Sequence, residues 1–398
     1  MQGKKLLHSI RIKNLLSYGE EGASLDLEPL NVLIGPNASG KSNLIEAISL
    51  LAATPRDLMR PIREGGGTSQ DWLWKGTEEP PVAEIEAAVA YEQPPLASSL
   101  LVYHLAFTVS DYHLGILREE IRSESGDLYA LQRDQAEVLI PRLSEREIRG
   151  SAEASVYRNK IDPQKSTLSQ VKDPFFYPDL THVSEQFDKI KLFRGWPLGR
   201  YSTIRKPQGV NLPGDFLLED ASNLGLVVNN LQNRLATKRL LLEKLKLFYE
   251  EVEDVGTSVQ GGTIQVFFHE RGLKSPVPAA CLSDGTLHYL CLLTILLHPE
   301  PPPLICLEEP ELGLHPDIIP TVAELLIEAS QRTQLIVTTH SEMLVSALSG
   351  IPESVVVCER DDRGTNLRRL DPEKLKEWLE HYRLGDLWAK GEIGGNRW

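Results

Sequence analysis

A lysine and a serine at the end of a glycine-rich stretch are the first residues whose types and spacing could do chemistry. There two glycines are separated by four residues and followed by Lys and Ser: Gly35, Pro36, Asn37, Ala38, Ser39, Gly40, Lys41, Ser42 and Asn43. Both glycines let the backbone curl until successive N–H groups point inward at a polyphosphate. Lys41 would reach the β- and γ-phosphates, and the Ser42 hydroxyl would hold Mg²⁺. The stretch predicts a nucleoside triphosphate site; the alternative is a glycine-rich turn in another kind of α/β protein.

Two carboxylates and a histidine could complete the chemistry of such a site. Glu308 and Glu309 end the apolar segment 303–307, and His340 follows the apolar segment 334–337. A first acid can steady Mg²⁺, and a second can polarise the attacking water. A histidine just beyond the carboxyl end of a buried strand can reach a γ-phosphate. In isolation, ordinary strand and turn residues explain both groups better, but the glycine-rich loop favours the functional interpretation.

A serine before a predicted helix adds another anion-facing surface. Ser283 and Gly285 lie in Leu-Ser-Asp-Gly-Thr, at the start of a helix predicted over 285–297. The Ser283 hydroxyl and the helix N-terminus would both face a phosphate. A serine that only caps its helix is the alternative, and the two roles are compatible.

Strands and helices alternate around these motifs. The apolar segment 30–34 predicts a buried strand before the loop, and an amphipathic helix follows it from residue 43. Segments 82–91, 100–110, 114–123 and 127–131 predict an antiparallel meander. Other strands are expected at 6–16, 25–27, 189–196, 263–268, 304–307, 334–338 and 354–358, and other helices at 217–234 (capped by Asp220 or Ser222), 241–252, 318–329 and 341–348. No element is predicted for residues 141–188.

The composition is that of an ordinary soluble protein, with 41% apolar residues, 25% charged residues and a net charge of −14. No apolar run approaches the roughly 18 residues that cross a bilayer, so no membrane contact is expected. The acidic balance disfavours indiscriminate DNA binding, because Lys and Arg must displace counterions there. Cytoplasmic location is expected because the N-terminus lacks a signal peptide. The cysteines form no Cys-x-x-Cys pair and are expected as buried, reduced thiols: Cys281, Cys291, Cys306 and Cys358.

Two segments could contact partners. Basic residues gather in and before the predicted helix 241–252, but acids are interleaved, so a solvated face is favoured over a nucleic-acid contact. Residues 384–398 mix Trp388, Ile393 and Trp398 with glycines, which predicts a docking tail; a frayed terminus is the alternative.

Taken in order, the motifs resemble those of a known family. They are Gly-Pro-Asn-Ala-Ser-Gly-Lys-Ser-Asn (35–43), Leu-Ser-Asp-Gly (282–285), Leu-Glu-Glu-Pro-Glu-Leu-Gly-Leu-His-Pro (307–316) and Thr-Thr-His-Ser (338–341). The chain looks like an ABC-type ATPase head of the RecF, SMC and OLD-like group, often labelled AAA-family ATPases. The resemblance implies an α/β P-loop NTPase fold with a mixed sheet, an antiparallel β lobe and a helical insert around 215–255. It is weaker over 205–209, 221–225 and 384–395.

The resemblance also implies ATP and Mg²⁺ as cofactors and ATP hydrolysis as the activity. Lys41 and Ser42 would act on the nucleotide of their own subunit, with residues 35–43 around its phosphates. Glu308 would be the Mg²⁺-side acid, Glu309 the general base and His340 the γ-phosphate contact. Ser283 and Gly285 would contact the ATP of a second subunit. ATP would therefore join two heads into a homodimer, and hydrolysis would release them.

Some positions depart from the family pattern. Glu308 stands where aspartate is usual, and Leu16 stands where an arginine often follows the first strand. The glutamine that senses nucleotide in such heads has only Gln70 as a weak candidate. No long coiled-coil arm, zinc hook or TOPRIM nuclease module is expected.

We therefore expect one head over residues 1–360, with a phosphate-loop lobe (1–140), an insert (141–260) and a third lobe (261–360), before a C-terminal helix and tail (361–398). Its ATP-driven dimerisation would regulate a protein partner, by analogy a nuclease or toxin in bacterial defence or DNA maintenance. The alternative is a RecF-like DNA-repair ATPase that binds DNA directly. The Leu-Gly-Leu-His-Pro motif argues against a third function, that of a transporter ATPase.

Overall fold

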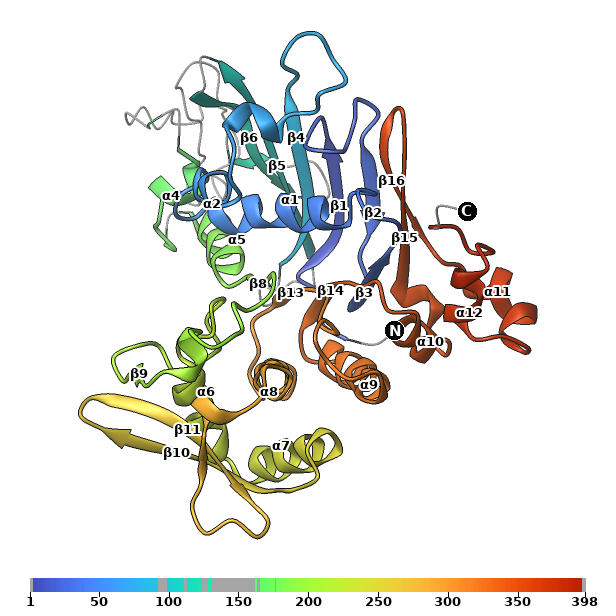
Figure 1. The fold of residues 1–398 in the computed structure, drawn as a ribbon. Coiled ribbons are helices and arrows are strands. Elements are labelled where there is room, and N and C mark those ends of the chain that lie inside the picture. Colours follow the sequence, from blue (N-terminus) through green and yellow to red (C-terminus); the bar gives the residue numbers. More distant parts are fainter. Residues whose placement is uncertain are drawn as a thin grey trace. The chain divides into compact units, whose positions relative to one another are not determined.

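The computed structural model describes residues 3–91, 99–110, 113–123, 128–130, 162, 165–175 and 177–395. The chain forms two compact units, each assembled from segments that lie far apart in the sequence (Figure 1). The phosphate-loop unit comprises Lys5–Ile190, Glu353–Asp371 and the residues from Gly391 onward. The acidic-loop unit comprises Lys191–Pro352 and Pro372–Lys390, with the first residues of the chain up to Lys4.

A six-stranded antiparallel sheet forms one layer of the phosphate-loop unit, in the order β2-β1-β4-β5-β6-β7. The strands are β1 (Leu7–Lys13), β2 (Ala23–Asp26), β4 (Ala83–Tyr91), β5 (Ser99–Ser110), β6 (His113–Ser123) and β7 (Leu128–Ala130). Alternate residues of β4 are buried, as in a strand with one face on a core. Since β4 to β7 pair in chain order, the predicted meander is confirmed.

Helices α1 (Lys41–Ala53) and α5 (Pro178–Asp188) pack against each other in the same unit. Phe187 of α5 meets Tyr103 of β5 edge to face, with ring centroids 5.2 Å apart, which ties this helix to the sheet. The short α2 (Arg60–Glu64) and α4 (Thr167–Gln170) complete its helices in the described ranges. The buried Glu119 of β6 accepts hydrogen bonds from Ser166 Oγ and Thr167 N and so fixes the start of α4.

A second group of strands carries the phosphate loop. Strand β3 (Leu30–Ile34) is buried along its whole length and pairs in parallel with β15 (Val355–Asp361). Strand β15 in turn pairs antiparallel with β16 (Gly364–Arg369). The unit therefore combines a mixed sheet with an antiparallel lobe, as expected for the fold.

Three parallel strands form the centre of the acidic-loop unit: β8 (Lys191–Phe193), β13 (Leu304–Glu308) and β14 (Gln334–Thr338). Helix α9 (Ile319–Ser330) connects β13 to β14, because parallel neighbours need such a crossover. Helices α8 (Asp284–Leu296), α10 (Glu342–Ala347), α11 (Pro372–Leu379) and α12 (Leu384–Ala389) complete this part. The helical insert contains α6 (Leu224–Gln232) and α7 (Leu235–Phe248), with the hairpin β10 (Val252–Gln260) and β11 (Thr263–Glu270) and the two-residue strands β9 (Gln208–Gly209) and β12 (Val277–Pro278).

Some predicted boundaries were wrong. The helix predicted over 217–234 begins only at Leu224, after Asn223 rather than Asp220 or Ser222. The reason is that Asn223 is buried and uses its side-chain amide to bond Pro213 O, Phe216 O and Leu218 N, which holds the preceding chain in a turn. Val252 does not continue the second helix but starts β10.

The C-terminal segment 384–395 is not frayed. Leu384, Leu387 and Trp388 of α12 are buried, and α12 packs on α10. In the phosphate-loop unit, Ile393 is buried and its carbonyl accepts a hydrogen bond from Arg368. The segment thus anchors on this chain, while Trp398 lies outside the described residues. No helix in the described part of the chain is long and apolar enough to span a membrane.

The four cysteines are free thiols, but Cys281 is exposed, which corrects the expectation that all are buried. Burial raises the pKa of Cys358 to about 12 and raises the pKa of Cys291 and Cys306 well above the ordinary thiol value. Because the thiolate is the nucleophile, these three are protected by burial and by protonation.

We expect one thiol of the native protein to react rapidly with a disulfide reagent such as DTNB at neutral pH. Cys281→Ser should remove that fast phase, whereas Cys291→Ser should leave it unchanged. The measurement is absorbance of the released thiolate before and after unfolding in guanidinium. Four fast thiols in the native protein would contradict the described burial.

Candidate functional site

The glycine-rich loop runs from the end of β3 to the first residue of α1, as the motif requires. Gly35 has a φ of +148°, and a Cβ atom there would lie 2.2 Å from Cys358 O. Gly40 has a φ of +101°, and a Cβ atom there would lie 2.3 Å from Thr365 Oγ1. Both positions therefore exclude side chains by conformation and by space.

Lys41 lies inside the curl that these glycines permit. Its side chain is buried, and Nζ donates to Gly35 O at 2.8 Å and to Pro36 O at 2.9 Å. The neighbouring Ser39 hydroxyl is also buried, and it has no hydrogen-bond partner among the described residues. A buried polar group normally has a partner, so a buried hydroxyl beside a buried ammonium indicates a place for an anionic ligand.

Residues from both ends of the chain brace the loop. Thr365 Oγ1 on β16 donates to Ser39 O at 3.0 Å and forms a second hydrogen bond with Ser17 Oγ at 2.7 Å. The buried Tyr18 hydroxyl donates to Gly40 O at 3.2 Å. Asn43 Nδ2 donates to Ser17 Oγ at 2.7 Å. Sequence reasoning missed Ser17, Tyr18 and Thr365, because nothing in the sequence marks contacts between such distant positions.

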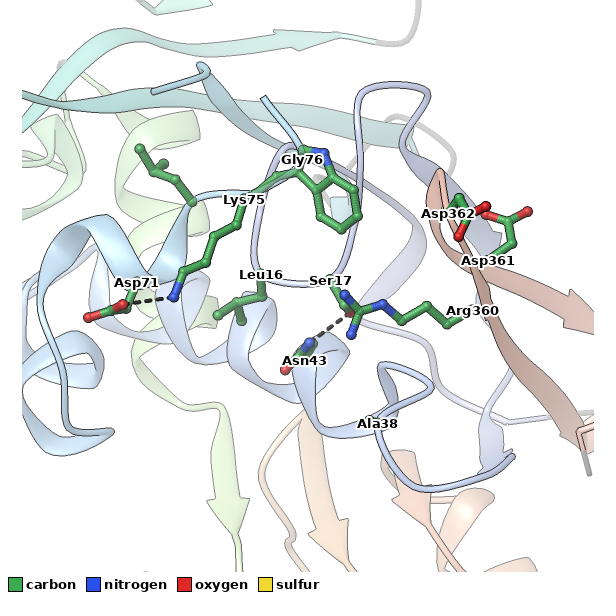
Figure 2. A pocket seen from close by; sticks show the side chains of 12 residues that line it. Leu16, Ser17, Ala38, Asn43, Asp71, Lys75, Gly76, Arg360, Asp361 and Asp362 are labelled. Atoms are coloured by element: carbon green, nitrogen blue, oxygen red, sulfur yellow. Dashed lines mark hydrogen bonds and ion pairs between the residues drawn. The ribbon is translucent and has the colours of Figure 1, made fainter. Parts of the chain in front are cut away.

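A pocket of about 720 Å³ adjoins the loop (Figure 2). Its lining comes from the loop after β1, the phosphate loop, the segment after Ser69–Trp72 and the β15–β16 hairpin: Leu16, Ser17, Ala38, Asn43, Asp71, Leu73, Trp74, Lys75, Gly76, Arg360, Asp361 and Asp362. The Arg360 guanidinium carbon lies 5.9 Å from the centre of the Trp74 ring. Leu16 is thus at the pocket wall, whereas Gln70 is exposed and does not line it.

In the acidic-loop unit, the acids and the histidine meet at the carboxyl ends of β13 and β14. Glu308 is the last residue of β13 and lies opposite Thr338 of β14. Glu309 has a φ of +44°, and its N–H donates to Thr338 O at 3.0 Å. His340 Nε2 lies 3.8 Å from Glu309 Oε1. The two side chains are partly exposed, so they can meet a ligand from solvent.

Glu311 fastens this arrangement, although sequence reasoning did not single it out. One carboxylate oxygen accepts hydrogen bonds from Thr339 Oγ1 at 2.6 Å and from His340 N at 3.0 Å. The other carboxylate oxygen is buried and meets no hydrogen-bond donor in the described part of the chain. Glu311 therefore holds the backbone that presents His340.

Ser283 caps α8, since its Oγ accepts a hydrogen bond from Thr286 N at 3.0 Å. The capping role is therefore observed, and a ligand role stays a prediction. A Cβ atom on Gly285 would lie 3.1 Å from Gly313 O, so the start of α8 lies against the segment after Glu309. His288 of α8 donates from Nε2 to Pro310 O at 3.1 Å, and burial lowers the pKa of His288 to about 4. A neutral imidazole thus links α8 to the segment that follows Glu309.

Arg205 braces the segment before Ser283. Its guanidinium donates to the carbonyls of Ala279, Ala280, Leu282 and Gly199 and to the Asp284 carboxylate. The hydrogen bond from Arg205 to Asp284 holds the pKa of the Asp284 carboxyl below its ordinary value. Only 11% of the Arg205 side chain is exposed.

The donor atoms fit Mg²⁺ without a dedicated metal cage. No group of three or more His, Cys, Asp or Glu side chains in the described ranges could hold a metal ion. Mg²⁺ is usually held by one or two protein oxygens together with substrate phosphates and waters. The Ser42 hydroxyl and the Glu308 carboxylate are each oxygen donors of this kind, and their role in holding Mg²⁺ stays a prediction.

Arg205→Met should lower the free energy of unfolding by roughly 2–3 kcal/mol, because several acceptors lose a charged donor whose side chain is only 11% exposed. Arg234→Met is the matched control, since it removes an exposed ion pair with Glu300 and should cost less than about 1 kcal/mol. Urea unfolding followed by circular dichroism measures both. Equal effects would show that Arg205 does not brace the segment.

Comparison with known proteins places this architecture in a family. The family described as "AAA domain, putative AbiEii toxin, Type IV TA system" matches residues 30–127 and 132–346, which is more than half of the chain. A segment of 75 residues is 40% identical to the Old nuclease of Escherichia phage P2, and it covers 19% of this chain and 12% of that protein.

Solved SMC heads share the fold at low sequence identity. One is an SMC head bound to the C-winged helix domain of ScpA, with a TM-score of 0.54, 14% identity, and coverage of 93% of this chain and 99% of that one. Another is the SMC head from Pyrococcus furiosus with an extended coiled coil, bound to the C-terminal domain of ScpA, with a TM-score of 0.54, 14% identity, and coverage of 94% and 98%. The chain therefore belongs to the family described as "AAA domain, putative AbiEii toxin, Type IV TA system", and it has the ABC-type P-loop α/β fold of an SMC head.

Proposed function

We propose that this chain binds and hydrolyses ATP, and that ATP-driven pairing of two heads regulates a protein partner. The observation that carries the proposal is the phosphate loop, which contains a buried Lys41 ammonium and a buried Ser39 hydroxyl without a hydrogen-bond partner among the described residues. Membership in a family of AAA domains supports a nucleotide as that anion. The backbone N–H groups of residues 35 and 37–43 would surround the phosphates, since Pro36 has no N–H.

The adenosine would occupy the pocket beside the loop. Ala38 and Asn43 belong to both the loop and the pocket wall, so phosphates in the loop direct the nucleoside there. A volume of about 720 Å³ is within the range of small-ligand pockets. The Trp74 ring offers a face on which a purine can stack.

The acids and the histidine would act on the terminal phosphate. Glu309 would take a proton from the attacking water, and His340, held by Glu311, would contact the γ-phosphate. When bound, Mg²⁺ would neutralise phosphate charge, with Ser42 and Glu308 as its protein ligands.

A second copy of the chain would complete each site through Ser283 and Gly285. Two apolar side chains near the acidic residues favour such a contact: Leu312 is 65% exposed and Met343 is 41% exposed. Exposed apolar side chains next to a polar site are typical of an interface. The SMC heads described above bind a second protein, ScpA, which makes a protein partner a reasonable expectation for this head.

The effector class follows by analogy from the names of relatives, a nuclease and a putative toxin. Direct DNA binding remains the second candidate, on the basis of the basic residues around α7. Two of those residues are paired with acids, Arg234 with Glu300 and Lys238 with Asp254, which favours a solvated face. Retention on a DNA column at physiological salt would favour the second candidate.

Lys41→Ala should abolish stabilisation by ATP. At an ATP concentration 100 times the Kd, the native protein should gain about 2.7 kcal/mol, and the variant should gain almost none. Lys13→Ala, which removes a half-buried ion pair with Glu84 in the same unit, is the control and should keep the gain. Thermal unfolding with and without ATP tests this prediction. If ATP raises the unfolding temperature of Lys41→Ala as much as that of the unaltered protein, the phosphate loop is not the ATP site.

Glu309→Gln should slow hydrolysis by roughly 10²- to 10⁴-fold, because the side chain keeps its shape but loses its basicity. Unconsumed ATP should then hold two heads together, so this variant should sediment as a dimer with ATP and Mg²⁺. Ser283→Arg should bind ATP yet stay monomeric, because the larger, charged arginine side chain would disrupt the contact between the two heads.

Glu324→Gln, an exposed glutamate on α9, is the matched control for charge and should behave as the unaltered protein. Sedimentation velocity with and without ATP measures the outcome for each variant. A monomeric Glu309→Gln with bound ATP, or normal hydrolysis by Ser283→Arg, would show that the chain acts as a solitary nucleotide switch.

A further inference from the structure

An arginine lies beside the acid proposed to hold Mg²⁺. Strands β8 and β13 are parallel neighbours in which Phe193 lies opposite Leu307. Arg194 and Glu308 are the next residues in the two segments. Arg194 Nε lies 3.8 Å from Glu308 Oε1. The Arg194 side chain is 36% exposed and the Glu308 side chain 19% exposed. The pair thus lies at the carboxyl ends of two parallel strands, where such sheets bind ligands.

The surroundings of the pair are rich in carboxylates. Glu309 follows Glu308 directly, and Glu311 lies close to His340 at the end of β14. A site with several acids repels a polyphosphate unless cations compensate for them. The Arg194 guanidinium supplies positive charge at this edge from the protein itself. Its planar fork can bond two oxygens of one phosphate, which a lysine ammonium cannot do.

We propose that Arg194 is a catalytic residue whose guanidinium changes its bonding partner from Glu308 to the terminal phosphate of ATP. In the structure the Arg194 guanidinium pairs with Glu308. With ATP bound, the guanidinium would instead bond the γ-phosphate oxygens, where charge is spread in the transition state of phosphoryl transfer. Glu308 would then be one of the oxygen donors that hold Mg²⁺. The inference rests on the proposed function, because it needs ATP at this edge.

A purely structural role explains the pair less well. An ion pair between partly exposed side chains at a separation of 3.8 Å contributes little to stability. Arg194 also follows a strand of only three residues, Lys191–Phe193, whose pairing with β13 does not involve the arginine side chain. The position therefore suits a residue that moves between partners.

The test compares binding of a triphosphate and a diphosphate. Affinities for AMP-PNP and for ADP, each with Mg²⁺, are measured by isothermal titration calorimetry for the unaltered protein, Arg194→Ala and Arg194→Lys. Arg194→Ala should lose roughly tenfold or more in AMP-PNP affinity, the loss of one charge-assisted phosphate contact, and keep its ADP affinity. Arg194→Lys should fall between, because it keeps the charge but not the fork. Unchanged ADP binding also shows that the variant is folded.

Arg234→Ala is the matched control, since its partner Glu300 precedes the start of β13 and so lies at the opposite end of that strand from Glu308. It should leave both affinities unchanged. Equal losses for AMP-PNP and ADP in Arg194→Ala, or no loss in either, would overturn the proposal, since Arg194 would then not touch the terminal phosphate. If the unaltered protein binds neither nucleotide, the proposed function itself fails, and the inference fails with it.

Discussion

A buried ammonium group inside a tight turn of backbone is the constraint on which the phosphate-loop unit depends. Burying a cation is costly unless it is hydrogen-bonded, and Lys41 Nζ meets this cost with the carbonyls of Gly35 and Pro36. Those carbonyls face the ammonium only because the loop passes through positive φ at Gly35, Ala38 and Gly40. The curl in turn needs close neighbours on β15 and β16, whose backbone and Thr365 leave no room for a Cβ atom.

The acidic-loop unit has a comparable constraint at an acidic residue, Glu309. Glu309 adopts a left-handed backbone, which costs on the order of 1–3 kcal/mol for a residue with a side chain. Hydrogen bonds from its N–H to Thr338 offset this cost and direct the chain away from the strand. Glu311 then returns to bond the end of β14. Strain at the position proposed for the general base is thus held by the loop that surrounds it.

Much of this organisation could be predicted from the sequence, because the motifs are local. A buried strand before a glycine-rich loop and apolar segments before Glu308 and before His340 are visible in short windows, and so is the meander of β4 to β7. The braces are not local. Thr365 meets Ser17 across 348 positions, and Arg205 meets Leu282 across 77. Strand β16 was missed because its residues are mostly polar, and the start of α6 was misplaced because a buried Asn223 overrides the local cap preferences.

The span between Ser17 and Thr365 has a consequence for how the protein is made. Synthesis proceeds from the N-terminus, and domains generally fold as their residues emerge. The glycine-rich motif leaves the ribosome early, but the hydroxyl that secures its backbone arrives only with β16. Contacts of such long sequence separation form late, because the entropy of closing the intervening chain must be overcome first. A nascent chain therefore carries the nucleotide motif without the bonds that shape it until β16 has been synthesised, and it can hold a phosphate only after that point.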